Sequence, residues 1–365
     1  MFVSAKPGHT IDEARASEEA PLARTRLAPF LAALLLTGAG CAAEVPPPKT
    51  PHIPLTPPAE LCGDSSLGEH GLCLPSERID RLLKTARFEV KAVKGTASGI
   101  GGAKVLVLHL PDEALTFRVK WKQSKHGGDG LNNTPRMEIA AYEAQKFFLD
   151  PDEYVVPPTV GRCLPKGSFD EPLGSGDWTF DGVACLYGIL SYWIEGVTDE
   201  GVYDLPRFAR DASYREGLGR MNLFTYLIGH RDTRLSNFII SKDPRSPRTF
   251  SIDNGLAFSG LRNPRLLFVD EWNEIIVPSL PRRQIARLRR VTRADLDTLA
   301  VVAQYQLLPD AMVEVPATAP LSTEEGVRRV GDVIQLGLTT EEIDEMEERL
   351  HDLIAQVDRG WFPVR

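Results

Sequence analysis

Short apolar runs separated by turn-forming residues predict a small sheet in the first half of the chain. A glycine-rich stretch, 95–102, separates the first two runs, and Pro111 opens the turn before the third. The residues in front of them, 75–87, have the pattern of a helix. The expected strands are residues 88–93, 104–110 and 115–121.

A helix is expected next, because Thr134 can serve as its N-cap and Pro135 suits the first helical position. The apolar residues of 137–149 then recur with helical spacing. Val160 and the range 182–195 again favour strands. From Asp211 onward the pattern predicts a mainly helical chain with one interruption.

That interruption combines polar residues with a predicted hairpin. The helix 214–228 leads into a polar loop containing Asp232 and Asn237, and two short strands, 238–240 and 249–252, then lead to Asp253. Two carboxylates and an amide brought close together suit a hard divalent cation that holds phosphates. Taken separately, His230-Arg231-Asp232 also fits a surface turn with a local ion pair, and Asn254-Gly255 fits an ordinary hairpin turn.

The composition favours a globular protein. Of 365 residues, 42% are hydrophobic and 25% are charged, and the formal net charge is −8. No long basic run is present, so we expect no nucleic-acid partner. One arginine cluster has near-helical spacing and is interpreted as a solvated helix face. Its members are Arg282, Arg283, Arg287, Arg289, Arg290 and Arg293.

The N-terminal residues have the pattern of an export signal. An uncharged Leu/Ala-rich stretch, 27–40, follows two arginines and is too short to cross a bilayer comfortably. It leads to Cys41 in a way that resembles the lipobox of bacterial lipoproteins, although Gly38 stands where those proteins usually have leucine. We therefore expect a signal peptide at 1–40, lipidation and membrane attachment at Cys41, and a proline-rich linker at 41–60. A secretory cleavage region with an incidental cysteine is the alternative.

Four further cysteines agree with export, because an oxidising compartment allows two disulfides. Cys62 with Cys73 and Cys163 with Cys185 would close the shortest loops, and sequential pairing is expected. A zinc site is the alternative, although no CxxC pair is present.

The polar loop and hairpin resemble the catalytic loop and metal-binding segment of kinase-fold phosphotransferases. The order of KWKQ, EIAAYE, VPPTVGR, the Asp232 loop and SIDNGLAF is similar to the secretory-pathway kinase family that includes the Golgi casein kinase and the proteoglycan xylose kinase. It also resembles, more distantly, phosphatidylinositol 3/4-kinase-like proteins. The resemblance covers about residues 90–300. It departs at the catalytic loop, where relatives often have Gly-Asn-x-Asp-Arg-His and this chain has His230 and Thr233-Arg234 around Asp232.

The resemblance implies site residues. Asp232 would orient the acceptor hydroxyl, and Asp253, with Asn237 or Glu138, would bind Mg²⁺ or Mn²⁺. For ATP it implies a lysine paired with Glu138 and a glycine-rich loop; the corresponding residues are Lys120, Lys122, Glu138, Gly95, Gly99 and Gly101. Lys120 and Lys122 share one face of a strand, and we prefer Lys120 for the phosphate contact.

The resemblance also implies an α+β fold of two lobes. A small β-rich N-lobe with the cysteine loop would span 61–185, and a mainly helical C-lobe would span 186–365. The expected function is that of an exported kinase at the cell envelope, acting on a hydroxyl of a protein, sugar or lipid headgroup. A pseudokinase that serves as a binding module is the alternative, and a purely structural exported domain is a further one.

Overall fold

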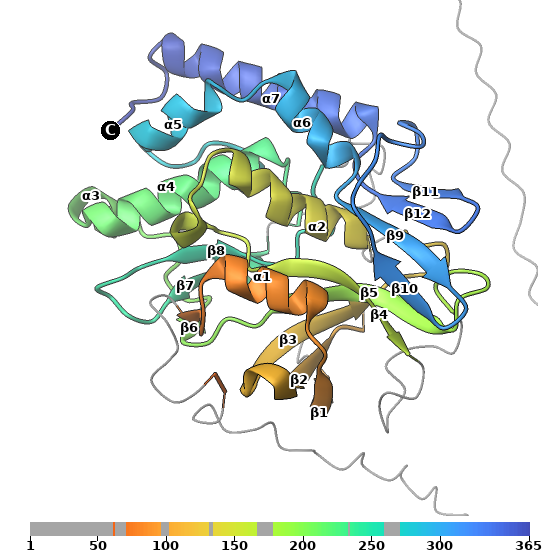
Figure 1. Ribbon diagram of the computed structural model, residues 1–365. Helices are drawn as coiled ribbons and strands as arrows, with labels where there is room; N and C mark the ends of the chain where they lie inside the picture. The colour runs from red at the N-terminus through yellow and green to blue at the C-terminus, as the bar shows by residue number, and fades with distance from the viewer. Residues whose placement is uncertain are drawn as a thin grey trace, which may run out of the picture. The chain divides into compact units, whose positions relative to one another are not determined.

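The computed structural model describes most of the chain after residue 60 (Figure 1). The chain divides into two units, 1–50 and 51–365, and every described residue belongs to the second. The expected signal peptide, Cys41 and the proline-rich linker lie outside the described residues. The described ranges are 61–62, 71–95, 102–130, 134–165, 178–232, 234–258 and 271–365.

A five-stranded antiparallel sheet contains the strands predicted from the first half of the chain. Its order is β1-β2-β3-β5-β4. A turn at 111–113 separates the apolar residues of β2 from those of β3, so these two strands form close to their predicted bounds. The strands are β1 (Glu89–Gly95), β2 (Lys104–Leu110), β3 (Leu115–Gln123), β4 (Thr159–Pro165) and β5 (Cys185–Tyr192).

Two helices pack against this sheet. The first, α1 (Ser76–Thr85), contacts β4, and the second, α2 (Pro135–Ala144), contacts β4 and β5. Helix α2 is shorter than expected, because a 3-10 turn, Gln145–Phe147, replaces its last part. Thr134 and Pro135 occupy the expected N-cap and first helical positions, but the Thr134 hydroxyl donates to the Gly130 carbonyl and accepts no bond from a helix N–H.

The remaining helices surround α2 on the side away from the sheet (Figure 1). Apolar residues of α2, α4 and α7 belong to one buried core. Asp211 begins α4 by accepting a hydrogen bond from the Tyr214 N–H, and Thr339 begins α7 through a capping box with Glu342. These helices are α3 (Leu205–Arg210), α4 (Ala212–Leu227), α5 (Arg282–Leu288), α6 (Arg293–Asp297) and α7 (Thr340–Asp358).

The later part of the chain contains more strand than expected. A second antiparallel sheet of order β10-β9-β12-β11 precedes α7, so the prediction of one interruption after Asp211 is wrong. Its strands are short, and Gln304 and Gln335 are buried on the face opposite Tyr305 and Leu336, where they bond to each other and to residues 316–319. The strands are β9 (Ala303–Leu308), β10 (Ala311–Glu314), β11 (Val327–Val330) and β12 (Val333–Leu336).

The predicted hairpin belongs to a third, smaller sheet. Its strands β7 (Phe238–Ser241) and β8 (Thr249–Ser251) pair in antiparallel register, and β6 (Val197–Thr198) adds to the outer side of β7. Helix α4 contacts β8. The chain therefore leaves α4, passes through the polar loop, and returns beside the helix with Asp253 two residues beyond β8.

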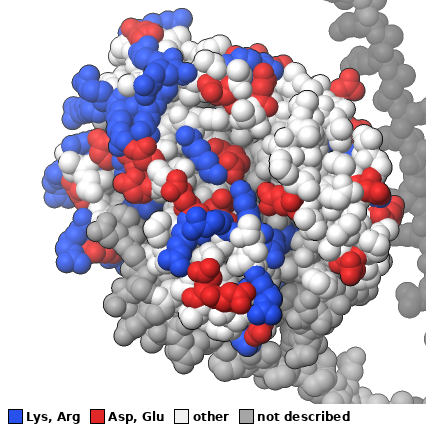
Figure 2. Space-filling model, in the orientation of Figure 1, with Lys and Arg blue, Asp and Glu red and all other residues white. Residues whose placement is uncertain are grey.

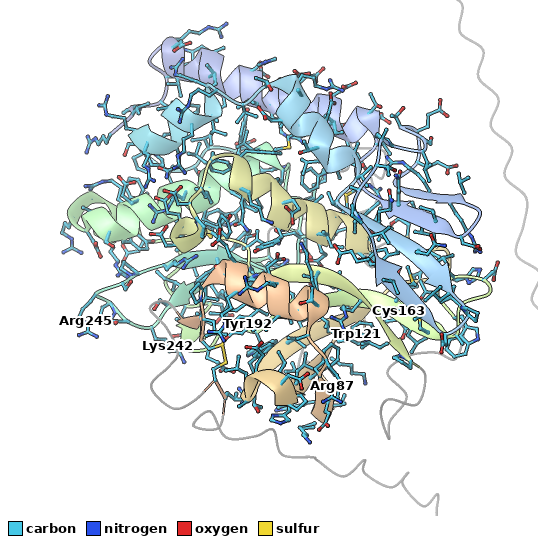
Figure 3. The ribbon with its side chains drawn as sticks, viewed as in Figure 1. Arg87, Trp121, Cys163, Tyr192, Lys242 and Arg245 are labelled. Atoms are coloured by element: carbon cyan, nitrogen blue, oxygen red, sulfur yellow. A yellow bond between two sulfur atoms is a disulfide. The ribbon has the colours of Figure 1, made fainter. Side chains whose placement is uncertain are left out.

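Both predicted disulfides, Cys62–Cys73 and Cys163–Cys185, are present. Tyr192, labelled in Figure 3, accepts a hydrogen bond from the Cys73 N–H through its hydroxyl. The Cys163–Cys185 disulfide joins β4 to β5. Disulfides are consistent with an exported protein. Among the described residues, no helix has both the length and the apolar composition needed to cross a bilayer.

Candidate functional site

Four charged side chains from three separate parts of the chain meet beside the end of β8. Lys120 and Lys122 come from β3, Glu138 from α2, and Asp253 follows β8. The Asp253 carboxylate lies 3.2 Å from the Lys120 Nζ and 2.8 Å from the Lys122 Nζ. The Lys122 Nζ also lies 3.4 Å from the Glu138 carboxylate. Residues more than one hundred positions apart in the sequence therefore form one ionic cluster.

Lys122, and not Lys120, makes the pair with Glu138. The two lysines face the same side of β3, as period two requires, but they lie two strand positions apart. Helix α2 places Glu138 level with the second of them. The Lys122 side chain is only 8% exposed, against 16% for Lys120. The expectation that Lys120 is the partner of Glu138 is therefore wrong, and Lys120 contacts Asp253 alone within this cluster.

Glu138 connects the cluster to the residue after Asp253. One of its carboxylate oxygens faces Lys122, and the other accepts a hydrogen bond of 3.0 Å from the Asn254 N–H. Burial by itself lowers the pKa of Lys122, but the nearby Glu138 and Asp253 carboxylates outweigh burial and raise it. Lys122 is thus a cation at neutral pH although it is buried.

Asp253 has an uncommon backbone conformation. Its φ is +62°, in the left-handed region that residues with a side chain rarely adopt. The carboxyl is 30% exposed, more than the other carboxylate of the cluster. Burial raises its pKa, yet Lys120 and Lys122 hold the pKa of Asp253 well below its ordinary value. The result is an ionised carboxylate that remains partly accessible to a ligand.

The polar loop after α4 is fastened to the end of β8. The Asn237 side-chain amide donates to the Asp232 carbonyl at 2.8 Å, and the Asn237 carbonyl accepts from the Ile252 N–H at 2.8 Å. These bonds hold Asp232 and Asn237 near the residue that precedes Asp253. These two hydrogen bonds support the expected juxtaposition of Asp232, Asn237 and Asp253.

Asp232 is buried and is paired with one arginine. The Arg234 guanidinium donates two hydrogen bonds to its carboxylate, at 2.7 and 2.5 Å. Such a two-pronged arrangement is the strongest geometry for an arginine and a carboxylate. The interpretation of His230-Arg231-Asp232 as a surface turn is wrong, because His230 and Asp232 are buried. A local ion pair is present all the same, and Arg234 provides it.

His230 is the residue of this loop that sequence reasoning missed. Its ring is fully buried against Phe238, with 5.5 Å between the two ring centroids. Within the described part of the chain, neither ring nitrogen has a hydrogen-bond partner. Burial lowers the pKa of His230 to about 4, although the Asp232 and Asp253 charges act in the opposite direction. The ring is therefore neutral at physiological pH, and its signal in the sequence was only its position two residues before Asp232.

The glycine-rich stretch is described only at its edges. Gly95 is the last residue of β1 and is exposed, whereas Gly99 and Gly101 lie outside the described residues. The described ranges contain no group of three or more His, Cys, Asp or Glu side chains able to hold a metal. A magnesium ion that also binds phosphates commonly needs only one or two protein carboxylates, which is within the reach of Asp253.

No family model matches the chain, and no curated protein matches its sequence.

Proposed function

We propose that the protein is an exported kinase-like phosphotransferase that moves the γ-phosphate of ATP to a hydroxyl acceptor. The observation that carries the proposal is the convergence of Lys122, Glu138 and Asp253 from three distant elements. A buried lysine held by two carboxylates supplies fixed positive charge for phosphate oxygens. The resemblance in the sequence points to the same residues, with the lysine shifted from 120 to 122.

The residues of the cluster fit a nucleotide that carries a divalent ion. Asp253 is ionised and partly exposed, so its carboxylate suits Mg²⁺ or Mn²⁺, and Asn237 is the second candidate ligand from the chain. Glu138 serves to hold Lys122 and the Asn254 N–H, and it is less available for a metal. A bound divalent ion would neutralise phosphate charge. Lys120 would add a second cation on the same side.

Asp232 would orient the acceptor hydroxyl and accept its proton. Its backbone is tied to Asn237, so the distance between the acceptor and metal residues is set by the loop itself. Most of the acceleration in such a reaction comes from positioning and charge neutralisation. Ser/Thr side chains, sugars and lipid headgroups all offer a suitable hydroxyl.

The proposal includes an arrangement of two lobes. A β-rich N-lobe of 61–185 would contribute the lysines and Glu138, and a C-lobe of 186–365 would contribute Asp232, Asn237 and Asp253. The five-stranded sheet would form the N-lobe, and because β5 (Cys185–Tyr192) is one of its inner strands, the boundary between the lobes would lie after Tyr192 and not at 185. ATP would bind where the two sets of residues meet.

One observation favours a second candidate, a pseudokinase that binds a nucleotide or a protein without catalysis. The Arg234 guanidinium occupies the carboxylate of Asp232 with two hydrogen bonds. An acceptor must displace Arg234 before it can reach that carboxylate. In the pseudokinase alternative the ion pair between Asp232 and Arg234 does not open.

Location at the cell envelope is part of the proposal. The disulfides favour an oxidising compartment, and the sequence around Cys41 favours a lipid on that cysteine. Mass spectrometry of the protein from its native membrane is expected to find Cys41 as the first residue, carrying acyl chains. An unprocessed N-terminus would contradict export.

The nucleotide site is tested by thermal unfolding with ATP, in the presence of Mg²⁺ or Mn²⁺ and with a chelator. A ligand that binds only the folded protein raises the midpoint. We expect a metal-dependent rise for the parent and none for Asp253→Ala. The control is Asp243→Ala, which removes a partly exposed aspartate of the β7–β8 turn and keeps the rise. An equal rise in both variants would reject the site, and nucleotide binding without transfer to any acceptor would favour the pseudokinase.

A further inference from the structure

The most exposed large hydrophobic side chain of the described residues is Trp361, at 63%. It lies just beyond α7, in a segment that runs back along the start of α5. Leu280 forms a parallel bridge with Val364, and its N–H donates to the Pro363 carbonyl at 2.8 Å. The segment and α5 are therefore joined by backbone pairing and present one continuous surface.

Four arginines lie on α5, just after it or just after α7, and two of them contact the tryptophan or its segment. Arg359 lies over the indole ring, 5.4 Å from its centroid, and Arg282 donates to the Val364 carbonyl at 3.3 Å. Arg289 pairs with Asp358 at the end of α7. We call this set the arginine–tryptophan surface; its members are Arg282, Arg289, Arg290, Arg359 and Trp361.

The positive charge of this surface is mostly uncompensated. Asp358 neutralises Arg289, whereas Arg282, Arg290 and Arg359 make no ion pair with any carboxylate of the described residues. The whole chain has a formal charge of −8, so the sign of this surface is opposite to that of the protein. Figure 2 shows Lys and Arg side chains gathered over the position of α5 and the C-terminal residues.

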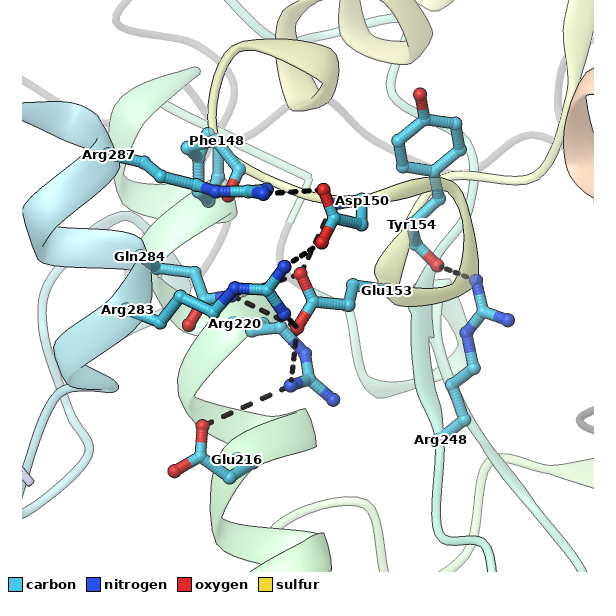
Figure 4. A network of polar contacts seen from close by, with 10 residues as sticks. All are labelled: Phe148, Asp150, Glu153, Tyr154, Glu216, Arg220, Arg248, Arg283, Gln284 and Arg287. Atoms are coloured by element: carbon cyan, nitrogen blue, oxygen red, sulfur yellow. Dashed lines mark hydrogen bonds and ion pairs between the residues drawn. The ribbon is translucent and has the colours of Figure 1, made fainter. Parts of the chain in front are cut away.

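The other arginines of α5 serve a different purpose. Arg283 and Arg287 bind the carboxylates of Asp150 and Glu153, as Figure 4 shows. These two hold α5 to the body of the protein. Ion pairs within the protein thus explain the positions of Arg283 and Arg287, but they do not explain the arginine–tryptophan surface. The expected solvated helix face consequently has two parts, one paired within the protein and one turned outward.

We propose that the arginine–tryptophan surface docks on an anionic phospholipid bilayer. Arginine forms strong, two-pronged hydrogen bonds with phosphate groups, and tryptophan favours the boundary between headgroups and acyl chains. Each basic residue near such a surface strengthens binding about fivefold. The negative charge elsewhere on the protein orients this surface toward the bilayer. The proposal is independent of the phosphotransferase function.

Sedimentation with vesicles tests the proposal on the full chain carrying Cys41→Ser, which has no thiol to lipidate. Binding is compared between pure phosphatidylcholine vesicles and vesicles that also contain phosphatidylglycerol. The two arginines before the apolar stretch 27–40 also favour anionic vesicles, but they are present in every variant, so the matched charge reversals separate their contribution from that of the surface. We expect at least tenfold stronger binding to the anionic vesicles, weakened by high salt. Tryptophan emission should shift to shorter wavelength, and Trp361→Phe should remove this shift.

Matched charge reversals decide which surface is used. Arg282→Glu combined with Arg290→Glu should abolish the preference for anionic vesicles. The control, Arg87→Glu combined with Arg329→Glu, changes two exposed arginines on other elements and should keep it. Thermal unfolding of both variants checks that they fold. A parent that prefers neither vesicle, or an equal loss in both variants, would overturn the proposal, and the first result would leave an acidic protein as the candidate partner.

Discussion

Two charged networks join the segment around α2 to later parts of the chain, and they differ in how completely their members are paired. In the network of Figure 4, Glu153 accepts hydrogen bonds from Arg220, Arg283 and Gln284, at 3.1 to 3.3 Å. Asp150 binds Arg283 and Arg287. Each of these two carboxylates therefore has several donors from α4 or α5, which is typical of a structural network.

The cluster at Asp253 is different in kind. Asp253 has a positive φ, and the neighbouring His230 ring has two buried nitrogens without a partner in the described chain. Residues held in unfavourable conformations or left unsatisfied are frequent at functional sites. The first network has the pairing expected of a structural role, whereas the second has the features that the proposed site requires. Four sets of substitutions test this difference.

The largest effect is expected from Asp232→Asn. The substitution keeps the shape of the side chain but removes the proton acceptor, so phosphotransfer should fall by about a hundredfold or more, or about 3 kcal/mol. Metal-dependent binding of ATP should remain, in contrast to Asp253→Ala. Steady-state transfer to the acceptor panel and the thermal shift are measured side by side. Retained turnover would remove Asp232 from the catalytic role.

The next effect is expected from Glu153→Ala and acts on stability. The change leaves Arg220 and Gln284 without their shared acceptor in a mostly buried place, and it should lower the free energy of unfolding by about 2 to 3 kcal/mol. Denaturant titration measures this loss. Glu216→Ala removes an exposed partner of Arg220 at 4.0 Å and serves as the control, with a loss below about 0.5 kcal/mol. Equal losses would contradict the structural role given to Glu153.

His230 should make stability depend on pH. Its pKa is held at about 4 in the folded protein, below the ordinary value of 6.5, so protonation favours the unfolded chain. The contribution is present above about pH 6.5 and is lost as the pH falls toward 4. Between pH 7 and 5 the loss should be about 2 kcal/mol. His230→Phe should show a smaller loss over the same interval, and an unchanged slope would contradict the burial of the neutral ring.

The smallest effect is the difference between the two lysines. Lys122→Met removes the cation that joins Glu138 to Asp253, whereas Lys120→Met removes a contact to Asp253 alone. We expect the first variant to reduce phosphotransfer about tenfold more than the second, a difference of about 1.4 kcal/mol. Initial rates at saturating ATP measure it. The reverse order would return the phosphate-binding role to Lys120.

Local patterns in the sequence predicted the elements that local forces determine. Strands β2 and β3 and the helix α1 follow from alternation, turn residues and helical spacing, and the two disulfides follow from short loop lengths. The sheet β9–β12 did not follow, because its strands are only four to six residues long and its buried Gln304 and Gln335 bond to each other at 2.7 Å and to residues 316–319. Such side-chain pairing depends on tertiary contacts that a linear pattern does not contain.

The charged residues of the site were predicted from the sequence, but which of them form ion pairs with one another was not. Period two placed Lys120 and Lys122 on one face of a strand, yet the choice between them depends on where α2 lies along β3. That position is set by the packing of α2 on β4 and β5. The burial of His230 likewise depends on Phe238 in the following hairpin. Residue types could be read from the sequence, whereas distances between elements could not.

The Cys62–Cys73 bond gives the molecule a defined point at which mechanical load enters. Any pull on the segment before residue 61 reaches Cys62, whose N–H donates to the Thr116 carbonyl of β3. The disulfide then passes the load to Cys73, which is bonded to Tyr192 at the end of β5. Tension thereby reaches the five-stranded sheet through a covalent link and these two hydrogen bonds, and the chain between the two cysteines carries none of it.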